Sequence, residues 1–585
     1  MNDKKNEEII SGERMENEVT DAAFSAEDAI KKSESIPTKI AKATGILVAV
    51  QLFMRLFGII ENIVISQLGG SSNITDIYFL ARKITSPIMS FGEQVIMHSF
   101  LPSFVRKMEE EGEAKAWHLA STVINLMLII MIGIGVIGFL YTSQFLGFFL
   151  QEEGIKSVGQ YFNGIITSAW QNNPAYMENI PFILKVTKVF LGAMIFMAIS
   201  SITYCLLNSY KQFGLPAASD FVLKATTLII GVALNGKIGL IAFAVGFLFG
   251  AFLKLLTQVV GIKMIRAGYD GVKYTPKIDL KDPAFKSFLL LALPLIIGWA
   301  FSTFRTALEA FFLAQASSMV EGAMTSFEFA KKICDIPITV FPYVFGIALF
   351  PFLNDIASRG EKGKLREMLT TATKIMLLIF IPLAIAVSLF SKPIVSVLFA
   401  SEKFTEQAVT MTATTLSFYA FVMVFGALEI IVNQFYFANK DTVRPTLTGI
   451  YCLPLYAVVA YLGVMHFGIG ALGVVLAIVV YRVAKVIILY VMIRHKTDGL
   501  PIKSLLQTLL KIILALIPFA LICYVTLNID ALQITSHASG ARAKMLILLP
   551  YLVSGGLAFL SYFVALYFLK TEELTFLVNK IRKRK

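Results

Sequence analysis

The stretch Ala81-Arg82-Lys83-Ile84 returns 249 positions later as Ala330-Lys331-Lys332-Ile333. Each copy lies near the start of a long apolar segment. The first segment ends in Phe100-Leu101-Pro102 and the second in Leu349-Phe350-Pro351, again 249 positions apart. Adjacent cations inside an apolar helix are costly in lipid and mark functional positions. The repeat therefore predicts two equivalent halves of a transporter that face one central, positively charged cavity.

Long apolar segments make up most of the chain. Of its 585 residues, 56% are hydrophobic and only 16% are charged, a composition too apolar for a soluble protein of this size. Fourteen segments are long enough to cross a bilayer. They lie at 43–68, 75–104, 118–143, 183–208, 216–235, 239–262, 286–313, 323–354, 367–390, 406–437, 445–464, 469–493, 504–527 and 544–569. The sequence predicts an all-α polytopic membrane protein of about 14 transmembrane helices.

Lysine and arginine are divided unevenly between the connecting loops. If the N-terminus is cytoplasmic, the loops on that side and the C-terminal tail carry 24 Lys and Arg, and the opposite loops carry 5. Basic loops stay on the cytoplasmic side, so we expect both termini there. The net charge of +13 has the same origin. We expect the basic tail to lie against anionic lipid and expect no nucleic-acid partner.

Residues that would indicate enzymatic or metal chemistry are missing from the sequence. All four cysteines fall in apolar segments without CxxC spacing, which argues against a zinc site or a disulfide framework. They are Cys205, Cys334, Cys452 and Cys523. The sequence shows no phosphate-binding loop, metal-ligand cluster or nucleophile elbow. We therefore expect no enzyme, no catalytic residue, no bound metal and no cofactor.

The repeat extends beyond the basic pair and predicts the domain organisation. Thr75-Asp76 matches Met324-Thr325, and Lys211 with Pro216 matches Lys440 with Pro445 at an offset of 229. An even number of helices per repeat gives both halves the same orientation, so we expect two parallel six-helix bundles related by pseudo-two-fold symmetry, plus two extra C-terminal helices. The expected parts are an acidic disordered cytoplasmic tail (1–42), an N-terminal bundle (43–264), a cytoplasmic linker (265–285), a C-terminal bundle (286–495), two additional transmembrane helices (496–569) and a basic cytoplasmic tail (570–585).

Charged residues within the helices supply the candidate site. The candidates for substrate binding are four cations on equivalent helices of the two halves: Arg55, Lys83, Arg305 and Lys332. The candidates for charge balance or ion coupling are the carboxylates Asp76, Glu93, Asp335, Glu61 and Glu309. Glu309 follows Arg305 by four residues and shares its helix face, so the two form either an internal ion pair or a cavity wall. Three further cations near helix ends are expected to extend to the headgroup region: Lys254, Arg482 and Lys485.

The order of short motifs resembles the MurJ/MviN family of lipid II flippases over residues 43–569. The first half carries the motifs Arg55-Leu56-Phe57-Gly58, Leu68-Gly69-Gly70, Thr75-Asp76, Lys83, Glu93 and Phe100-Leu101-Pro102. The second half carries Ala330-Lys331-Lys332 with Asp335 and Pro337, Gly346-Ile347-Ala348-Leu349-Phe350-Pro351, Phe435-Tyr436-Phe437-Ala438, Lys440-Asp441-Thr442 and Arg444-Pro445.

This resemblance implies a flippase that moves undecaprenyl-pyrophosphate-linked peptidoglycan precursor, lipid II, across the bacterial cytoplasmic (inner) membrane by alternating access. It places Arg55, Asp76, Glu93 and Lys332 on positions that the family uses in its cavity. The chain departs from the family in three places: Lys332 stands where the family usually has arginine, Glu61 stands where it has a second arginine, and Met89-Ser90 stand where it has an arginine pair.

Other functions remain open at this point. The chain could export another lipid-linked oligosaccharide, such as an O-antigen or capsule unit, or act as a non-transporting membrane scaffold. A multidrug antiporter would favour an acidic cavity, against which the basic pairs count. The expected partners are the lipid-linked saccharide, the bilayer and cell-wall synthesis proteins. The driving force is a coupling cation, Na⁺ or H⁺, or the membrane potential.

Overall fold

The computed structural model describes residues 52–571 apart from 143–178, 213, 267–273, 495–496, 498 and 529–540. The expected acidic tail and most of the expected basic tail lie outside the described residues. The chain divides into two compact units, Met1–Arg55 and Leu56–Lys585. The fold below is that of the second unit, together with residues 52–55, which belong to the helix Leu52–Gly69.

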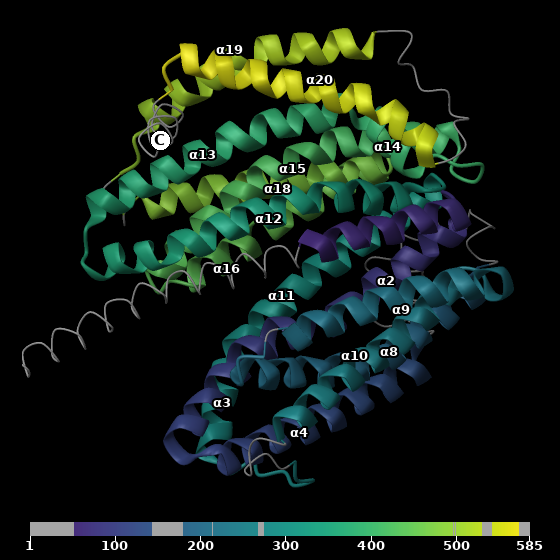
Figure 1. The fold of residues 1–585 in the computed structure, drawn as a ribbon, viewed down its shortest axis with the longest axis vertical. Helices are drawn as coiled ribbons and strands as arrows, with labels where there is room; N and C mark the ends of the chain where they lie inside the picture. Colours follow the sequence, from purple (N-terminus) through teal and green to yellow (C-terminus); the bar gives the residue numbers. More distant parts are fainter. Residues whose placement is uncertain are drawn as a thin grey trace, which may run out of the picture. The chain divides into compact units, whose positions relative to one another are not determined.

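Every element in the described part of the chain is a helix (Figure 1). After Leu52–Gly69, the first half consists of α2 (Asn73–Phe91), η1 (Gly92–Ile96), α3 (Met97–Glu111), α4 (Glu113–Leu140), α8 (Ile180–Ser209), α9 (Gly214–Ile238) and α10 (Ile241–Arg266). The second half consists of α11 (Pro283–Met319), α12 (Ala323–Ser358), α13 (Lys362–Leu389), α14 (Ser391–Phe399), α15 (Glu406–Ala438), α16 (Val443–Tyr451), α17 (Leu453–Tyr461), η3 (Leu462–His466) and α18 (Ala471–Ile493). Two further helices follow, α19 (Ile502–Leu527) and α20 (Ala541–Phe568).

Twelve helices in the described part are long and apolar enough to cross a membrane. The continuous stretch from α2 to α3 and the helix α12 are also long, but they carry the repeated cations. The all-α polytopic class is thus confirmed, whereas the number fourteen and the domain boundaries stay predictions. The expected segment 445–464 falls within one candidate span, Val443–His466. The α-helix is interrupted at Cys452, between α16 and α17, because Pro454 cannot donate a backbone hydrogen bond.

Two lysines show the repeat in the backbone itself. Lys211 follows α8 with φ 59°, and Lys440 follows α15 with φ 55°. Left-handed backbone is uncommon in residues other than glycine. Its occurrence at the two positions that the sequence matched shows that both halves turn from one helix into the next in the same way.

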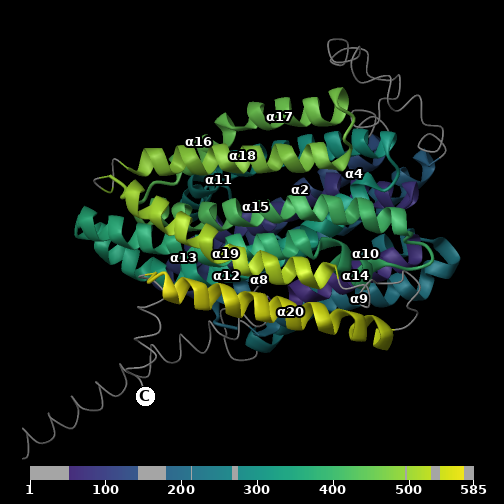
Figure 2. The ribbon, with the colours of Figure 1, turned by 90° about the horizontal axis from the view of Figure 1, so that it is seen from above.

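Each half packs around its own central helices. In the first, α10 packs on α8 and α9, and α4 packs on α8. In the second, α15 packs on α12, α13 and α18 (Figure 1). The additional helices α19 and α20 lie side by side in both views and contact α13 and α14 respectively (Figures 1 and 2).

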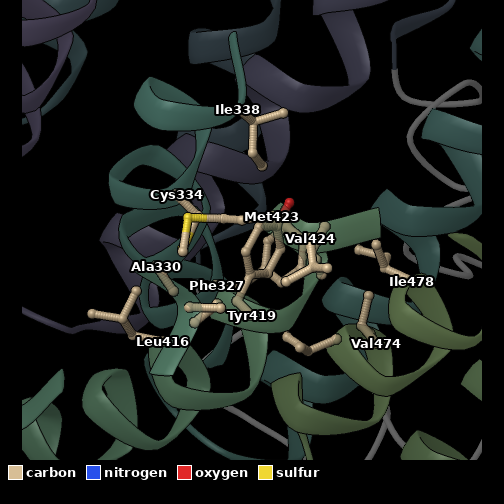
Figure 3. Close-up of a cluster of buried hydrophobic side chains, with 14 of the residues drawn as sticks. Phe327, Ala330, Cys334, Ile338, Leu416, Tyr419, Met423, Val424, Val474 and Ile478 are labelled. Carbon is tan, nitrogen blue, oxygen red and sulfur yellow. The ribbon is translucent and has the colours of Figure 1, made fainter. Parts of the chain in front are cut away.

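One packed face of α12 positions the second basic pair. Phe327, Ala330 and Cys334 of α12 lie against Tyr419 and Met423 of α15 (Figure 3), and all five are buried. These α12 residues recur every three to four positions and occupy one side of the helix. Because successive residues turn by about 100°, Lys331 and Lys332 point away from that side in different directions.

Candidate functional site

The first turns of α2 and α12 meet at Asp76. Its carboxylate is 1% exposed and accepts hydrogen bonds from the Gly322 amide (2.9 Å), the Thr325 amide (2.8 Å) and the Thr325 hydroxyl (2.6 Å). A carboxylate is favoured at a helix N-terminus, where α12 offers unpaired N–H groups. Asp76 and Thr325 are matched positions of the repeat, so the pseudo-two-fold axis passes between these helix ends.

Glycine is required at position 322 of this junction. Its φ is 83°, and a Cβ there would lie 1.9 Å from the Ser71 hydroxyl oxygen. The sequence predicted that Asp76 balances cavity cations. Among the side chains that the structure describes, Asp76 forms no ion pair and instead joins the two halves.

The first cation of each basic pair binds a carboxylate in its own half. Arg82 lies 2.7 Å from Glu61, and Lys331 lies 3.2 Å from Glu309. Both carboxylates are buried and belong to the first helix of their half. Glu61 thus neutralises Arg82, which explains how a carboxylate is accommodated where the resembling family has arginine.

The second cation of each pair crosses to the other half. The Lys83 ammonium lies 2.7 Å from Glu309 and 2.5 Å from Glu328, its side chain is 6% exposed, and it also lies 4.7 Å from the centre of the Phe327 ring. Two carboxylates and an aromatic face of the second half therefore stabilise a cation of the first.

The Lys332 side chain extends from the second half to the first, and its ammonium group has different neighbours from that of Lys83. A Cβ on Gly58 would lie 2.5 Å from Lys332 Cε and 2.7 Å from its Nζ, so the lysine packs against the backbone of the helix Leu52–Gly69. Glu61 is near enough to interact with it electrostatically. No ion pair involves Lys332 among the side chains that the structure describes.

Arg305 belongs both to this network and to a cavity in the second half. It lies 3.1 Å from Glu309, so the ion pair that its spacing allowed is present. It also lines a cavity of about 280 Å³ between α11, α15, α16, α17 and α18. The charged and phenolic residues of that cavity are Arg305, Glu429, Tyr481, Arg482 and Lys485.

The expectation that three helix-end cations extend to the headgroup region is wrong. Glu429 pairs with Lys485 at 2.7 Å and Arg482 at 3.1 Å. Lys254 pairs with Asp220 at 2.7 Å and is 7% exposed. Each cation has a carboxylate on a neighbouring helix, and this attraction draws the side chain inward. Such partners are distant in sequence.

The remaining candidates are only partly placed. Arg55 lies on the described helix Leu52–Gly69 and stays a prediction as a cavity residue. Asp335 lies on α12 and interacts electrostatically with Lys331. The Glu93 backbone lies in the π-helical turn η1, and its side chain falls outside the described part of the chain. Gly92 is held close to α8, since a Cβ there would lie 1.9 Å from the Ser201 hydroxyl oxygen.

Two important residues were not selected from the sequence. Glu328 was missed, although it precedes Lys331 and Lys332 by three and four residues, a spacing that places them on one helix face. Lys107 was also missed. It lies 2.5 Å from Asp282, and this buried pair joins α3 to the start of α11.

Asp282 is the N-cap of α11 and is followed by Pro283, a favourable start for a helix. Burial by itself would raise the pKa of Asp282. Hydrogen bonds from the Lys107 ammonium and the Ala284 amide outweigh burial and hold that pKa below its ordinary value of 3.8. The carboxylate is therefore stabilised in its charged form.

The chain matches the model of a known family. That model, described as lipid II flippase MurJ, matches residues 65–548. The chain belongs to the MurJ family. It is 25% identical to the probable lipid II flippase MurJ of Bdellovibrio bacteriovorus, over 92% of this chain and 96% of that protein. It is 23% identical to the lipid II flippase MurJ of Burkholderia cenocepacia, over 88% of this chain and 94% of that protein.

Solved structures show the same fold. A lipid II flippase MurJ in an inward closed conformation superposes with a TM-score of 0.67 and 20% identity, covering 88% of this chain and 98% of that one. An inward-facing MATE-family multidrug transporter gives a TM-score of 0.60 at 15% identity, covering 76% and 94%. MurJ proteins are transporters, so the predictions of a multi-pass membrane transporter rather than an enzyme are confirmed.

Proposed function

We propose that this chain translocates lipid II, the undecaprenyl-pyrophosphate-linked precursor of peptidoglycan, across the bacterial cytoplasmic membrane by alternating access. Beyond family membership, one observation carries the proposal. The side chains of Lys83 and Lys332 each extend from their own half and contact the other half. A cavity between two halves that move against each other is the usual place for a transported substrate. Cations there replace the hydration that a diphosphate loses on leaving water.

Lys332 is the cation that we assign to the diphosphate. Its neighbour Arg82 pairs with Glu61, and its counterpart Lys83 pairs with Glu309 and Glu328. Removing those cations from their carboxylates would leave buried charges uncompensated, which is costly. Lys332 has no ion pair to break among the described side chains, so it can bind an arriving anion at the least cost.

Alternating access requires contacts that form and break at the two ends of the interface. Asp76 holds α2 to the start of α12 at the outer end. Lys107 holds α3 to the start of α11 at the other end. We propose that these contacts are gates, and that the cavity opens to one side when one of them parts while the other remains closed.

Several finer statements belong to this proposal. Both termini are cytoplasmic, and the chain lies in the inner membrane. The first bundle spans 43–264, the second spans 286–495, and 265–285 links them. The driving force is Na⁺, H⁺ or the membrane potential, and cell-wall synthesis proteins are partners. The distribution of basic loops and the family resemblance support these statements.

A depletion experiment tests the function. A bacterium whose own lipid II flippase is depleted should grow when this full chain is expressed, and labelled lipid II should cross vesicles that contain the purified protein. A Lys254→Gln chain serves as control because Lys254 pairs with Asp220 away from the interface. Failure to support growth, together with flux of an O-antigen-type lipid in the same vesicles, would assign the chain to another lipid-linked saccharide.

Coupling is tested separately at Glu93. Its backbone lies in η1, and π-helical turns are frequent at functional sites. If Glu93 binds the coupling ion, Glu93→Gln should weaken the dependence of lipid II flux on an ion gradient or on membrane potential. Flux that keeps its full dependence in the variant would leave Glu93 as a structural counter-charge.

A further inference from the structure

The cavity inside the second half shares Arg305 with the network at the interface, but Lys332 is not among its lining residues. It is lined by α11, α15, α16, α17 and α18, and α18 packs on α16 and α17 (Figure 2). Its volume of about 280 Å³ falls just under the range of about 300–1,000 Å³ typical of pockets for drug-sized ligands. It suits a small group rather than a whole glycopeptide headgroup.

The charges on its wall do not balance. Arg305, Arg482 and Lys485 contribute three positive charges, and Glu429 contributes one negative charge. Glu429 is shared by Arg482 and Lys485. Charges of one sign held together at low dielectric repel one another strongly. An anion that entered the cavity would relieve that repulsion.

Arg305 also shares its carboxylate partner with other cations. Glu309 lies within ion-pair distance of Arg305, Lys83 and Lys331. One carboxylate therefore serves three cations. The side chain of Arg305 is 33% exposed and lines the cavity, so its guanidinium can donate further hydrogen bonds there while it keeps Glu309.

A phenolic side chain is also part of the wall. Tyr481 and Thr446 line the cavity, and the Thr446 hydroxyl donates a hydrogen bond to the Thr442 carbonyl at 3.0 Å. The ring of Tyr456 packs edge-on against Tyr481, and its buried hydroxyl has no hydrogen-bond partner among the residues that the structure describes. Hydroxyls and forked guanidinium groups are the donors that proteins use for phosphate oxygens.

Exposed apolar side chains lie on two of the helices that line the cavity. Phe301, on the cavity wall, is 40% exposed. On α16, Val443, Leu447 and Tyr451 are exposed at a spacing of four residues and form an apolar stripe beside the cavity residue Thr446. A polar pocket with exposed apolar side chains beside it suits a polar group attached to a lipid chain.

We propose that this cavity is a second anion site, which binds a phosphate or diphosphate group through Arg305, Arg482 and Lys485. Glu429 holds two of these cations in place when the site is vacant and sets its affinity by competing with the phosphate. The group belongs either to a membrane lipid or to a free phosphate compound. The site does not depend on which saccharide the chain transports.

The affinity of the purified full chain for three probes tests the proposal: inorganic pyrophosphate, undecaprenyl diphosphate and phosphatidylglycerol. Lys485→Gln and Arg482→Gln should each weaken binding of the recognised probe about tenfold or more, because each removes a charge-assisted contact. Each variant leaves Glu429 one cation, which limits the risk of misfolding. Glu429→Gln should strengthen binding, because the competing negative charge is gone.

Lys254→Gln is the matched control. Lys254 pairs with Asp220 at 2.7 Å, as Lys485 does with Glu429, but does not line the cavity. It should bind the probe as the unaltered chain does. Opposite shifts for Lys485→Gln and Glu429→Gln support the site, and the probe that binds identifies the source of the phosphate. Equal affinity in all variants, or shifts of the same sign at positions 485 and 429, would overturn it.

Discussion

Lys83 and Lys332 occupy the same place in the two halves, yet their surroundings differ. Lys83 lies between Glu309 and Glu328 and is almost fully buried. Lys332 lies against the backbone of Gly58, without an ion pair among the described side chains. The repeat therefore determines where a cation stands but not whether its charge is neutralised. A fully paired lysine stabilises the interface, and an unpaired one remains available to a substrate.

The largest effect on stability should come from removing the ion pairs of Lys83. Lys83→Met removes the described ion-pair partner of Glu328 and one of the three partners of Glu309. Loss of a buried ion-pair partner costs about 3–5 kcal/mol, so the melting temperature in detergent should fall sharply. A second change, Glu328→Gln, should restore part of it. No loss of stability in Lys83→Met would remove the contrast between the two lysines.

Substitution of Lys332, which has no described ion pair, should lower transport rather than stability. Lys332→Ala should lower lipid II flux in vesicles by about 30-fold or more, which corresponds to about 2 kcal/mol or more for a lost charged contact. Its melting temperature should stay close to that of the unaltered chain. Lys332→Arg should keep much of the flux because the charge is retained. Normal flux in the alanine variant would assign Lys332 to structure.

Weakening the contact between Asp76 and the start of α12 should cause a smaller loss of stability. Asp76→Asn keeps the size of the side chain but replaces charge-assisted hydrogen bonds to Gly322 and Thr325 with weaker ones, at a cost of about 1–2 kcal/mol. We expect faster exchange of the Gly322 and Thr325 amide hydrogens. Exchange as slow as in the unaltered chain would show that the junction does not depend on the charge.

The contact between Lys107 and Asp282 should give a pH-dependent effect of about 1 kcal/mol. Since the pKa of Asp282 in the folded chain lies below 3.8, the charged carboxylate stabilises the fold above that pH, and this stabilisation is lost as the pH falls through the lower folded value. The melting-temperature difference between the unaltered chain and Asp282→Asn should be constant above about pH 5 and shrink below pH 3.8. A difference that persists unchanged at pH 2 would contradict this assignment.

The smallest effect on stability and flux should come from substituting Gly58. Its matched position in the second half is Ala307, so Gly58→Ala makes the halves alike there. The new Cβ would meet only the flexible end of Lys332, which can move. Stability should be unchanged or rise by about 0.5–1 kcal/mol, the helix preference of alanine over glycine, while flux should fall less than in Lys332→Ala. Flux as low as in that variant would mean that Lys332 needs its present position.

Much of the fold was predictable because the membrane imposes simple rules on sequence. In lipid every backbone group must be satisfied within the helix, so apolar length alone locates helices. The break between α16 and α17 followed from proline chemistry but was not predicted. The ion pair of Arg305 with Glu309 was among the stated alternatives, because residues four apart share a helix face.

What the sequence determined by itself was the repeat, the all-helical class, the family resemblance and the positions of the cations. Only the tertiary structure decided which cations are neutralised. It paired Lys83 with carboxylates of the other half, Lys485 with Glu429, and Lys107 with Asp282. It also showed that Asp76 holds two helix ends together. The physical reason is that electrostatic interaction depends on distance in space, and these partners lie on helices whose separation along the chain says nothing about their separation in the folded protein.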